Sequence, residues 1–368
     1  MIASMELWVR LLLAAALAFI VSFLATPPVK RFAEMVGAID VPKDARRIHD
    51  HPIPRMGGLA IFLGFVISVL LFVDMSTKVT GILLGAVIIA VMGAVDDIVS
   101  LNPWVKLVGQ ILAAAVAIRC GLVFQVVSNL LAPGEAIDIG WLSVPLTVLW
   151  IVGCTNAVNL IDGLDGLAVG VSGISALTML LVALFVAEPS VCVILAALTG
   201  ACIGFMPYNL NPAKIFMGDV GSQFLGFVLS TASIMGLFKL HAIITFLVPL
   251  LALAVPLADT VFAFCRRILR GQSPFHADRG HFHHRLLAMG MNQKQAVAVL
   301  YGVSAVLGLI AVLLAGNSAP VRIVCLAAAF AVSIIVWLFV FHQSRIKQQA
   351  QEAQDKAEGR ENESDNTI

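Results

Sequence analysis

The chain has 368 residues, of which 60% are hydrophobic and 12% are charged, and its mean hydropathy is +0.98. A soluble domain carries about 25% charged residues, so this composition excludes a soluble globular protein and indicates a polytopic membrane protein. The formal net charge of +1 gives no indication of a partner.

Eleven apolar segments follow one another along the chain, and most approach the roughly 20 residues that a membrane helix needs. We expect helices, because lipid cannot satisfy the polar groups of an irregular backbone. The first segment reads as an uncleaved span, since no clear small-residue cleavage site follows it. The predicted spans cover residues 7–27, 56–74, 79–95, 104–121, 141–158, 166–187, 190–208, 221–238, 242–264, 295–315 and 321–341. The expected fold class is therefore all-α.

The distribution of basic residues predicts the orientation of these spans. Alternate connections and the tail after residue 342 hold 18 of the 23 lysine and arginine residues, and such an excess marks the cytoplasmic side. We therefore expect the N-terminus outside and the C-terminus in the cytoplasm. Residues 1–342 form the predicted multi-span domain, and the charged tail at 343–368 is predicted to be disordered.

The unusual polar clusters all fall in connections on the predicted cytoplasmic side, whereas the opposite connections are short and chemically plain. A transporter usually places its polar residues near the middle of the bilayer. This one-sided arrangement instead favours a site where a soluble cytoplasmic substrate meets a lipid. The clusters occupy residues 40–58, 96–97, 156–168, 208–222 and 266–290.

Carboxylates dominate three of these clusters. Asp96 and Asp97 adjoin a predicted span, and two close acids repel each other unless a proton or a cation intervenes. Asp162 and Asp165, in "NLIDGLDGLA", share a face if the segment is helical. Asp219, in "FMGDVGS", begins the next span, where exposed helix amides favour anions. A divalent cation would relieve the repulsion among such acids.

The last cluster, "HADRGHFHHRL", is basic and rich in histidine. Arg279, His281, His283 and His284 favour binding of phosphate over zinc, because no cysteine lies nearby to complete a zinc site. Phe216 is suitably placed to stack on a flat ring, although an aromatic residue at such a position is more often packing. Carboxylates, a cation such as Mg²⁺ and basic groups at a lipid–water boundary are typical of phosphoryl transfer.

Five motifs, in this order, resemble those of the polyprenyl-phosphate N-acetylhexosamine-1-phosphate transferases, glycosyltransferase family 4. They are "RIHDHPIPRMGG", "GAVDDI", "NAVNLIDGLDGLA", "FMGDVGS" and "SPFHADRGHFHHRL". The resemblance covers residues 7–342 and implies a bacterial cell-membrane enzyme with its active site on the cytoplasmic face. It would move N-acetylglucosamine (GlcNAc) 1-phosphate from UDP-GlcNAc to undecaprenyl phosphate, release UMP and so begin a cell-envelope glycan.

The resemblance also implies roles for individual residues. Asp219 would be the main Mg²⁺ ligand, with Asn159 as a second ligand and Mn²⁺ as a substitute ion. Asp162, Asp165 and Asn209 would line the nucleotide site, and Phe216 would stack on uracil. Asp96 and Asp97 would face the nucleophile, while Arg279, His281, His283 and His284 would hold the pyrophosphate or the sugar. No catalytic lysine can be aligned in the first cytoplasmic connection.

Several alternatives stay open at this point. The phospho-N-acetylmuramoyl-pentapeptide transferase branch carries three consecutive histidines followed by Phe-Glu, and "HFHHRL" argues against it. A cation-coupled transporter would use Asp96, Asp97 and Asp259 as an ion path, although Asp259 is also placed to pair with Arg266. Direct attack and a covalent phospho-enzyme are both compatible with the motifs. The implied partners are a UDP-sugar and a polyprenyl-phosphate lipid, without nucleic acid, and a homodimer is left open.

Overall fold

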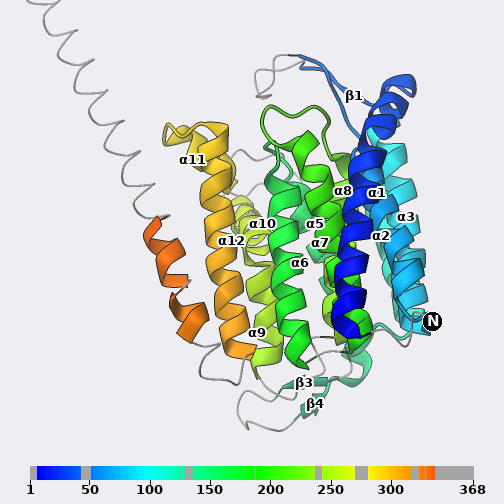
Figure 1. Ribbon diagram of the computed structural model, residues 1–368, viewed down its shortest axis with the longest axis vertical. Helices are drawn as coiled ribbons and strands as arrows, with labels where there is room; N and C mark the ends of the chain where they lie inside the picture. The colour runs from blue at the N-terminus through cyan, green and yellow to red at the C-terminus, as the bar shows by residue number, and fades with distance from the viewer. Residues whose placement is uncertain are drawn as a thin grey trace, which may run out of the picture.

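The computed structural model is mostly helical, and its helices run back and forth between two ends of a bundle (Figure 1). The structure describes residues 6–42, 51–124, 126–128, 136–186, 188–236, 243–269, 281–315, 323–327 and 329–335. The helices are α1 (Leu7–Met35), α2 (Gly58–Phe72), α3 (Thr77–Val99), α4 (Pro103–Arg119), α5 (Ser143–Leu160), α6 (Leu167–Val186), α7 (Pro189–Asn209), α8 (Gly218–Gly236), α9 (Ile243–Ala252), α10 (Ala254–Leu269), α11 (Phe282–Ala288) and α12 (Gln293–Ala315). A further apolar helix lies at Ile323–Ile335.

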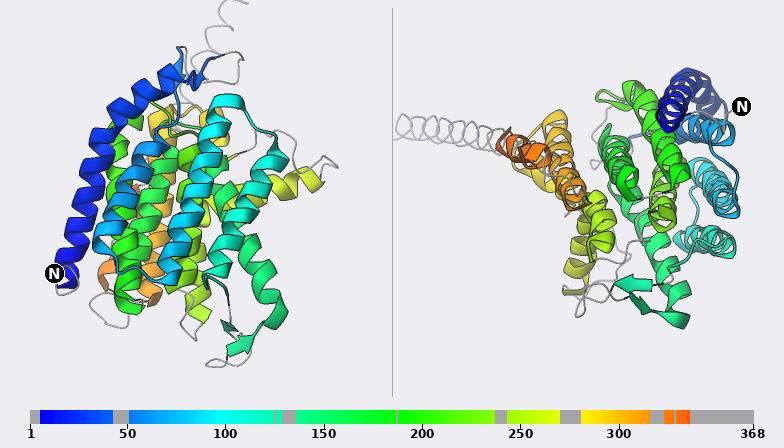
Figure 2. Two further views of the ribbon diagram at one scale, coloured as in Figure 1. Left: turned by 90° about the vertical axis from the view of Figure 1, so that its right-hand side faces the viewer. Right: turned by 60° about the horizontal axis from the view of Figure 1, so that its bottom comes forward.

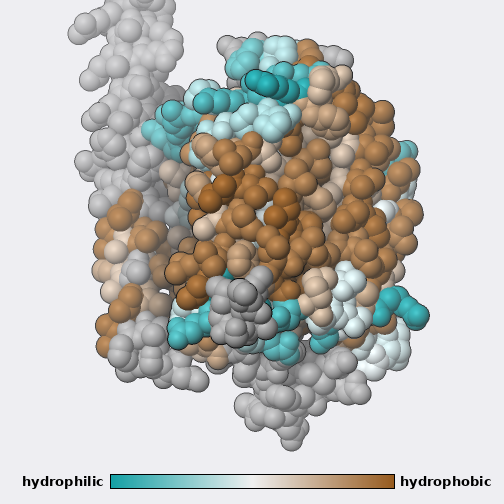
Figure 3. Space-filling model, turned by 45° about the vertical axis from the view of Figure 1, so that its right-hand side comes forward, coloured by the Kyte–Doolittle hydropathy of each residue, from teal (hydrophilic) through white to brown (hydrophobic). Residues whose placement is uncertain are grey.

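The helices agree with the apolar segments of the sequence, and the chain is a multi-pass membrane protein. Among the described residues, six helices are long and apolar enough to cross a membrane, and two shorter apolar helices accompany them. Figure 3 shows the consequence on the surface, where apolar residues form a broad band between polar ends. The predicted number of eleven spans and their orientation stay predictions.

The segment predicted as one span at 242–264 is divided into α9 and α10. Pro256 has no amide hydrogen with which to bond the carbonyl of Ala252, so the regular helix is interrupted there. The hydroxyl of Ser175 on α6 donates to that carbonyl at 2.5 Å and satisfies it. Beyond the break, α10 leans away from the common direction of the bundle (Figure 2).

Helices α7 and α8 form the centre of the bundle, since most of the residues of α7 and nearly all of those of α8 are buried. Helices α1, α2 and α6 pack on α7, while α3 and α5 pack on α8. Burial of this apolar surface against other helices fixes the position of α8, whose first turn carries Asp219.

The polar connections meet at one end of the bundle, which we call the site end (Figure 1). Here the short hairpin of β1 (Ile39–Asp40) and β2 (Ile53–Pro54) pairs antiparallel, with Asp40 opposite Ile53. The carbonyl of Pro54 accepts a hydrogen bond from the Phe216 amide at 2.8 Å, which joins this hairpin to the connection before α8. The hairpin of β3 (Val126–Ser128) and β4 (Ala136–Asp138) lies at the opposite end.

Candidate active site

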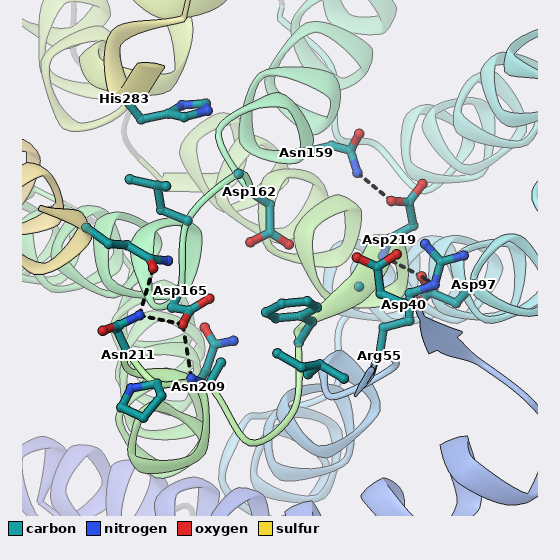
Figure 4. Close-up of a pocket in the computed structure, with 18 of the residues that line it drawn as sticks. Asp40, Arg55, Asp97, Asn159, Asp162, Asp165, Asn209, Asn211, Asp219 and His283 are labelled. Carbon is teal, nitrogen blue, oxygen red and sulfur yellow. Dashed lines mark hydrogen bonds and ion pairs between the residues drawn. The ribbon is translucent and has the colours of Figure 1, made fainter. Parts of the chain in front are cut away.

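A cavity of about 460 Å³ opens at the site end, and most of the predicted site residues that the structure describes line it. Figure 4 shows two groups of side chains across the cavity, with Asp162 between them. One group contains Asp40, Arg55, Asp97, Asn159 and Asp219, and the other contains Asp165, Asn209 and Asn211. Segments far apart in the sequence therefore converge on one polar cavity beside the apolar band.

Asp97 lies at the end of α3 and binds the beginning of α8. Its two carboxylate oxygens accept the backbone amides of Asp219 and Val220 at 3.0 and 3.2 Å, so Asp97 caps α8 from another helix. Arg55 lies near the same carboxylate, with its Nε atom 3.8 Å from Oδ1. Asp97 is thus buried, hydrogen-bonded to α8 and among the residues that line the cavity.

Two glycines permit this contact between α3 and α8. A Cβ atom at Gly93 would lie 2.4 Å from the Cα atom of Val220, so only glycine lets the helices approach so closely. Gly218 has a φ of +73°, and a Cβ atom there would lie 2.3 Å from the Asp97 carboxylate. The "GDVG" motif therefore has a local structural reason in addition to its carboxylate.

Asp219 is surrounded by nitrogen donors. Lys106 on α4 reaches its Oδ2 atom at 2.6 Å, and the Nζ atom of Lys106 also contacts the Asp96 carboxylate. Asn159 on α5 donates to Oδ1 at 3.1 Å, and Gln223 donates to Oδ2 at 3.2 Å. Gln223 is in turn held by Gln110, which donates to it at 2.9 Å. This network holds the carboxylate in one orientation at the cavity wall.

Asp162 has a different environment, because its carboxylate has no hydrogen-bond partner among the described residues. It lies in the connection between α5 and α6 and faces the middle of the cavity (Figure 4). Burial, together with the negative charges of Asp219, Asp97 and Asp165, raises the pKa of Asp162 to about 8. The cavity therefore has a surplus of negative charge that a bound cation would relieve.

The Asp165 side of the cavity is well ordered by hydrogen bonds. The Oδ2 atom of Asp165 accepts from the Asn211 side chain at 2.9 Å and from the Ala213 amide at 3.0 Å. Asn209 is buried and joins the two connections, accepting from the Gly166 amide and donating to the Ile215 carbonyl. Phe216 lines the cavity and is half-buried.

The histidines of the last motif are divided between two environments. His283 and His284 line the cavity, and burial with the neighbouring His284 ring lowers the pKa of His283 to about 4. The His283 ring is therefore neutral at pH 7. His281 is not among the cavity-lining residues, because its Nδ1 atom lies 2.7 Å from the Asp259 carboxylate. Arg279 lies outside the described residues.

The donor set fits a divalent cation chemically, although no three carboxylate, histidine or cysteine side chains in the described part of the chain converge closely enough to hold one. Mg²⁺ is usually held by one or two carboxylates, with substrate phosphates and water as the other ligands. The unpartnered Asp162 and the oriented Asp219 meet that requirement. The residues therefore fit a metal that arrives with a phosphate ligand.

Several residues of the site were not anticipated from the sequence, foremost Lys106, which contacts Asp219 but does not itself line the cavity. Lys106 is the single lysine or arginine in residues 96–106, and its position close to Asp96 and Asp97 could have indicated a role in the site. From the sequence, a catalytic lysine was considered only in the first cytoplasmic connection. Arg55 and Asn211 were not predicted either, although both lie within polar clusters that were identified in the sequence. Asp96 was grouped with Asp97, yet it contacts Lys106 and the Leu101 amide and does not line the cavity.

Comparison with known proteins supports a single family. The family model described as glycosyl transferase family 4 matches residues 79–237. A probable undecaprenyl-phosphate N-acetylglucosaminyl 1-phosphate transferase of Bacillus subtilis is 41% identical over 310 residues, which cover 84% of this chain and 86% of the relative. A decaprenyl-phosphate N-acetylglucosaminephosphotransferase of Mycobacterium tuberculosis is 34% identical over 79% of each chain. A phospho-N-acetylmuramoyl-pentapeptide-transferase of Staphylococcus aureus is 30% identical over 70% of this chain and 83% of its own length.

Proposed function

The chain belongs to the polyprenyl-phosphate N-acetylhexosamine-1-phosphate transferases of glycosyl transferase family 4, and we propose that it transfers GlcNAc 1-phosphate to undecaprenyl phosphate. The observation that carries the proposal is the convergence of Asp97, Asp162 and Asp219 on one cavity. The relatives from B. subtilis and M. tuberculosis, whose names state transfer of this sugar phosphate to undecaprenyl or decaprenyl phosphate, support it.

In the proposed reaction, UDP-GlcNAc is the donor. A phosphate oxygen of the lipid attacks the β-phosphorus of the donor, the bond to the bridging oxygen breaks, and UMP leaves with that oxygen. The lipid phosphate needs little help from a base, because a phosphate monoester has its second pKa near 6 and is mostly a dianion at pH 7. The work of the protein is therefore mainly positioning and stabilisation of charge.

The charged side of the cavity suits the diphosphate of the donor. Among the described residues, Lys106 forms an ion pair with Asp219, and Arg55 forms one with Asp97. Mg²⁺, when bound, would be held by Asp219 and Asp162 and would neutralise phosphate charge, with Asn159 beside it and Mn²⁺ as a substitute. Both oxygens of Asp97 accept helix amides, which favours an orienting role over attack by Asp97 on phosphorus.

The opposite side of the cavity suits the nucleoside. Asp165 and Asn211 present a rigid hydrogen-bonding edge, and Phe216 offers an aromatic face for uracil. His283 and His284 also line the cavity and would contact the sugar or the pyrophosphate. His283 would do so as a neutral hydrogen-bonding group and not as a cation.

The proposed membrane arrangement has eleven spans, with the N-terminus outside and the site end in the cytoplasm. The excess of lysine and arginine in the connections of the site end supports this orientation. A cytoplasmic cavity beside the apolar band would admit the water-soluble donor from one side and the lipid from the other.

The transporter alternative receives no support from the described contacts. Asp259 binds the beginning of α11, whereas Asp96 binds Lys106, so the acids of the supposed ion path belong to separate networks.

The pentapeptide-transferase alternative keeps some support from the S. aureus relative. The donor that the protein uses distinguishes this alternative from the proposed function.

The test is transfer by purified protein in nanodiscs with undecaprenyl phosphate, Mg²⁺ and donor labelled in the sugar and the β-phosphate. We expect both labels to enter the organic phase with release of one UMP per product. UDP-N-acetylmuramoyl-pentapeptide and UDP-N-acetylgalactosamine serve as competing donors, and a clear preference for either would overturn the GlcNAc assignment. Stoichiometric UMP release without lipid would indicate a covalent phospho-enzyme instead of direct attack.

A further inference from the structure

Asp259 is a buried carboxylate for which the proposed reaction provides no role. It lies in α10, is 2% exposed and is not among the residues that line the main cavity. An ionisable group in such surroundings is costly unless its oxygens are well satisfied. Its contacts therefore indicate what it is for.

Both oxygens of Asp259 bind the beginning of α11. Oδ1 accepts the backbone amide of Phe282 at 2.7 Å, and Oδ2 lies 2.7 Å from Nδ1 of His281. In the tautomer of His281 with a proton on Nδ1, this nitrogen donates to Oδ2. The His281 side chain does not cap its own helix, so Asp259 supplies the acceptor that the first amide of α11 requires.

The contact continues from His281 to the cavity. The rings of His281 and His283 are nearly parallel, with centroids 5.8 Å apart and an interplanar angle of 4°. His283 then lies against the Asp162–Asp165 connection, where a Cβ atom at Gly163 would be 2.5 Å from its Nε2 atom. Helix α11 is thus bound to α10 through Asp259, and through His283 it lies against the acidic connection.

We infer that Asp259 is a positioning residue that, through His281, holds α11 so that His283 and His284 face the cavity. The carboxylate acts twice, since it fixes the backbone of α11 through Phe282 and the orientation of the His281 ring through Nδ1. Among the described residues, α11 also contacts α12, the Phe262 ring of α10 through Phe282, and Gly163 through His283. The effect of Asp259 on substrate is indirect, by the placement of His283 and His284.

The consequence for substrate rests on the proposed function, but the anchoring itself does not. The experiment therefore has two readouts on the full-length protein in nanodiscs. Hydrogen–deuterium exchange of residues 281–289 reports whether α11 is held, and steady-state transfer with UDP-GlcNAc reports whether the histidines are placed. The variants are Asp259→Ala, Asp259→Asn and, as a matched control one residue along α10, Thr260→Val. The control removes a buried hydroxyl that has no hydrogen-bond partner in the described part of the chain.

For Asp259→Ala we expect amide exchange in residues 281–289 to quicken by about tenfold, with exchange in α12 unchanged. The KM for the donor should rise by about tenfold with a smaller change in kcat. Asp259→Asn should restore most of the protection, because its Oδ1 still accepts the Phe282 amide and its NH₂ group bonds the other tautomer of His281. Thr260→Val should match the wild type in both readouts.

Two results overturn the inference. If exchange in residues 281–289 is unchanged in Asp259→Ala, the carboxylate does not hold α11. If exchange quickens while the donor KM and kcat stay at wild-type values, Asp259 does not place the histidines. Absence of transfer by the wild-type protein would defeat the proposed function instead, and the exchange comparison would still decide the anchoring.

Discussion

Two adjacent carboxylates, Asp96 and Asp97, make different contacts because neighbouring residues in a helix point about 100° apart. Asp97 faces α8 and the cavity, whereas Asp96 faces Lys106 of α4. Together they fix the position of Asp219, one through its backbone amide and the other through the shared lysine. The carboxylates of Asp219 and Asp162 differ most in their hydrogen bonding. Asp219 accepts from several donors, whereas Asp162 has no donor among the described residues.

Asp219→Ala should abolish transfer, because it removes the oriented carboxylate and leaves Lys106 with Asp96 alone. We expect a loss of at least about a hundredfold in kcat/KM, with the protein still folded by gel filtration. The matched control is Asp74→Ala, which removes an exposed carboxylate paired with Arg10 at the opposite end of the bundle and should retain wild-type activity. Near-normal transfer by Asp219→Ala at ordinary Mg²⁺ concentration would contradict the role of Asp219.

Asp162→Asn should separate activity from stability. The pKa of Asp162 is raised from 3.8 to about 8, so the wild type loses stability as pH rises through this range and the carboxylate becomes charged. Asparagine keeps the shape without the charge. We therefore expect transfer to fall, while the Tm of the variant in metal-free buffer exceeds that of the wild type by a few degrees at pH 8.

The difference in Tm should shrink towards pH 4, where wild-type Asp162 is mostly protonated within the fold. A difference that is constant with pH, or of the opposite sign at pH 8, would show that burial and neighbouring charge do not act on Asp162 as described. Addition of Mg²⁺ should stabilise the wild type more than the variant, since only the wild type offers the carboxylate.

At the scale of elements, the site depends on the close approach of α3 and α8. Only the absence of side chains at Gly93 and Gly218 lets Asp97 reach the first amides of α8. The sequence predicts α3 and α8 as helices from their hydropathy, but nothing in hydropathy says that they pack against each other. The same holds for α10 and α11, whose contact through Asp259 and His281 was not predicted.

Gly218→Ala should lower both stability and transfer. Its φ of +73° disfavours alanine by about 1 to 2 kcal/mol, and the new Cβ atom would collide with the Asp97 carboxylate. The matched control is Gly153→Ala in α5, where an added Cβ atom meets nothing within 4 Å. This control should stabilise its helix by about 0.5 to 1 kcal/mol, as measured by thermal unfolding.

At the scale of the whole molecule, the polar and charged residues of the site all lie at one end of an apolar helical bundle. The chain crosses between the ends repeatedly, so connections distant in sequence return to the same place (Figure 1). The apolar band in Figure 3 separates this end from the β3–β4 end. The arrangement accounts for a site that needs acids from α3, α8 and the α5–α6 connection at once.

The orientation of the bundle can be tested with single cysteines in a chain whose six native cysteines are replaced. Met75→Cys lies in the exposed turn between α2 and α3, at the end opposite the cavity, and Lys214→Cys lies in the connection before α8. An impermeant maleimide should label Met75→Cys in intact cells and Lys214→Cys only in inverted membranes. The reverse pattern would place the cavity outside the cell and contradict the proposed donor, which is cytoplasmic.

The sequence by itself determined the helical class, the extents of most helices and the five motifs, because hydropathy and local residue pattern are properties of short segments. It also predicted that Asp97, Asp162 and Asp219 belong to one site, through the repeated return of the chain to one side. Only the tertiary structure decided which partners each acid meets, since Lys106 reaches Asp219 and Arg55 reaches Asp97 from segments that are distant in the chain. Packing between helices depends on the shapes of their buried faces and on a few glycines, so it cannot be predicted from the sequence of any single segment.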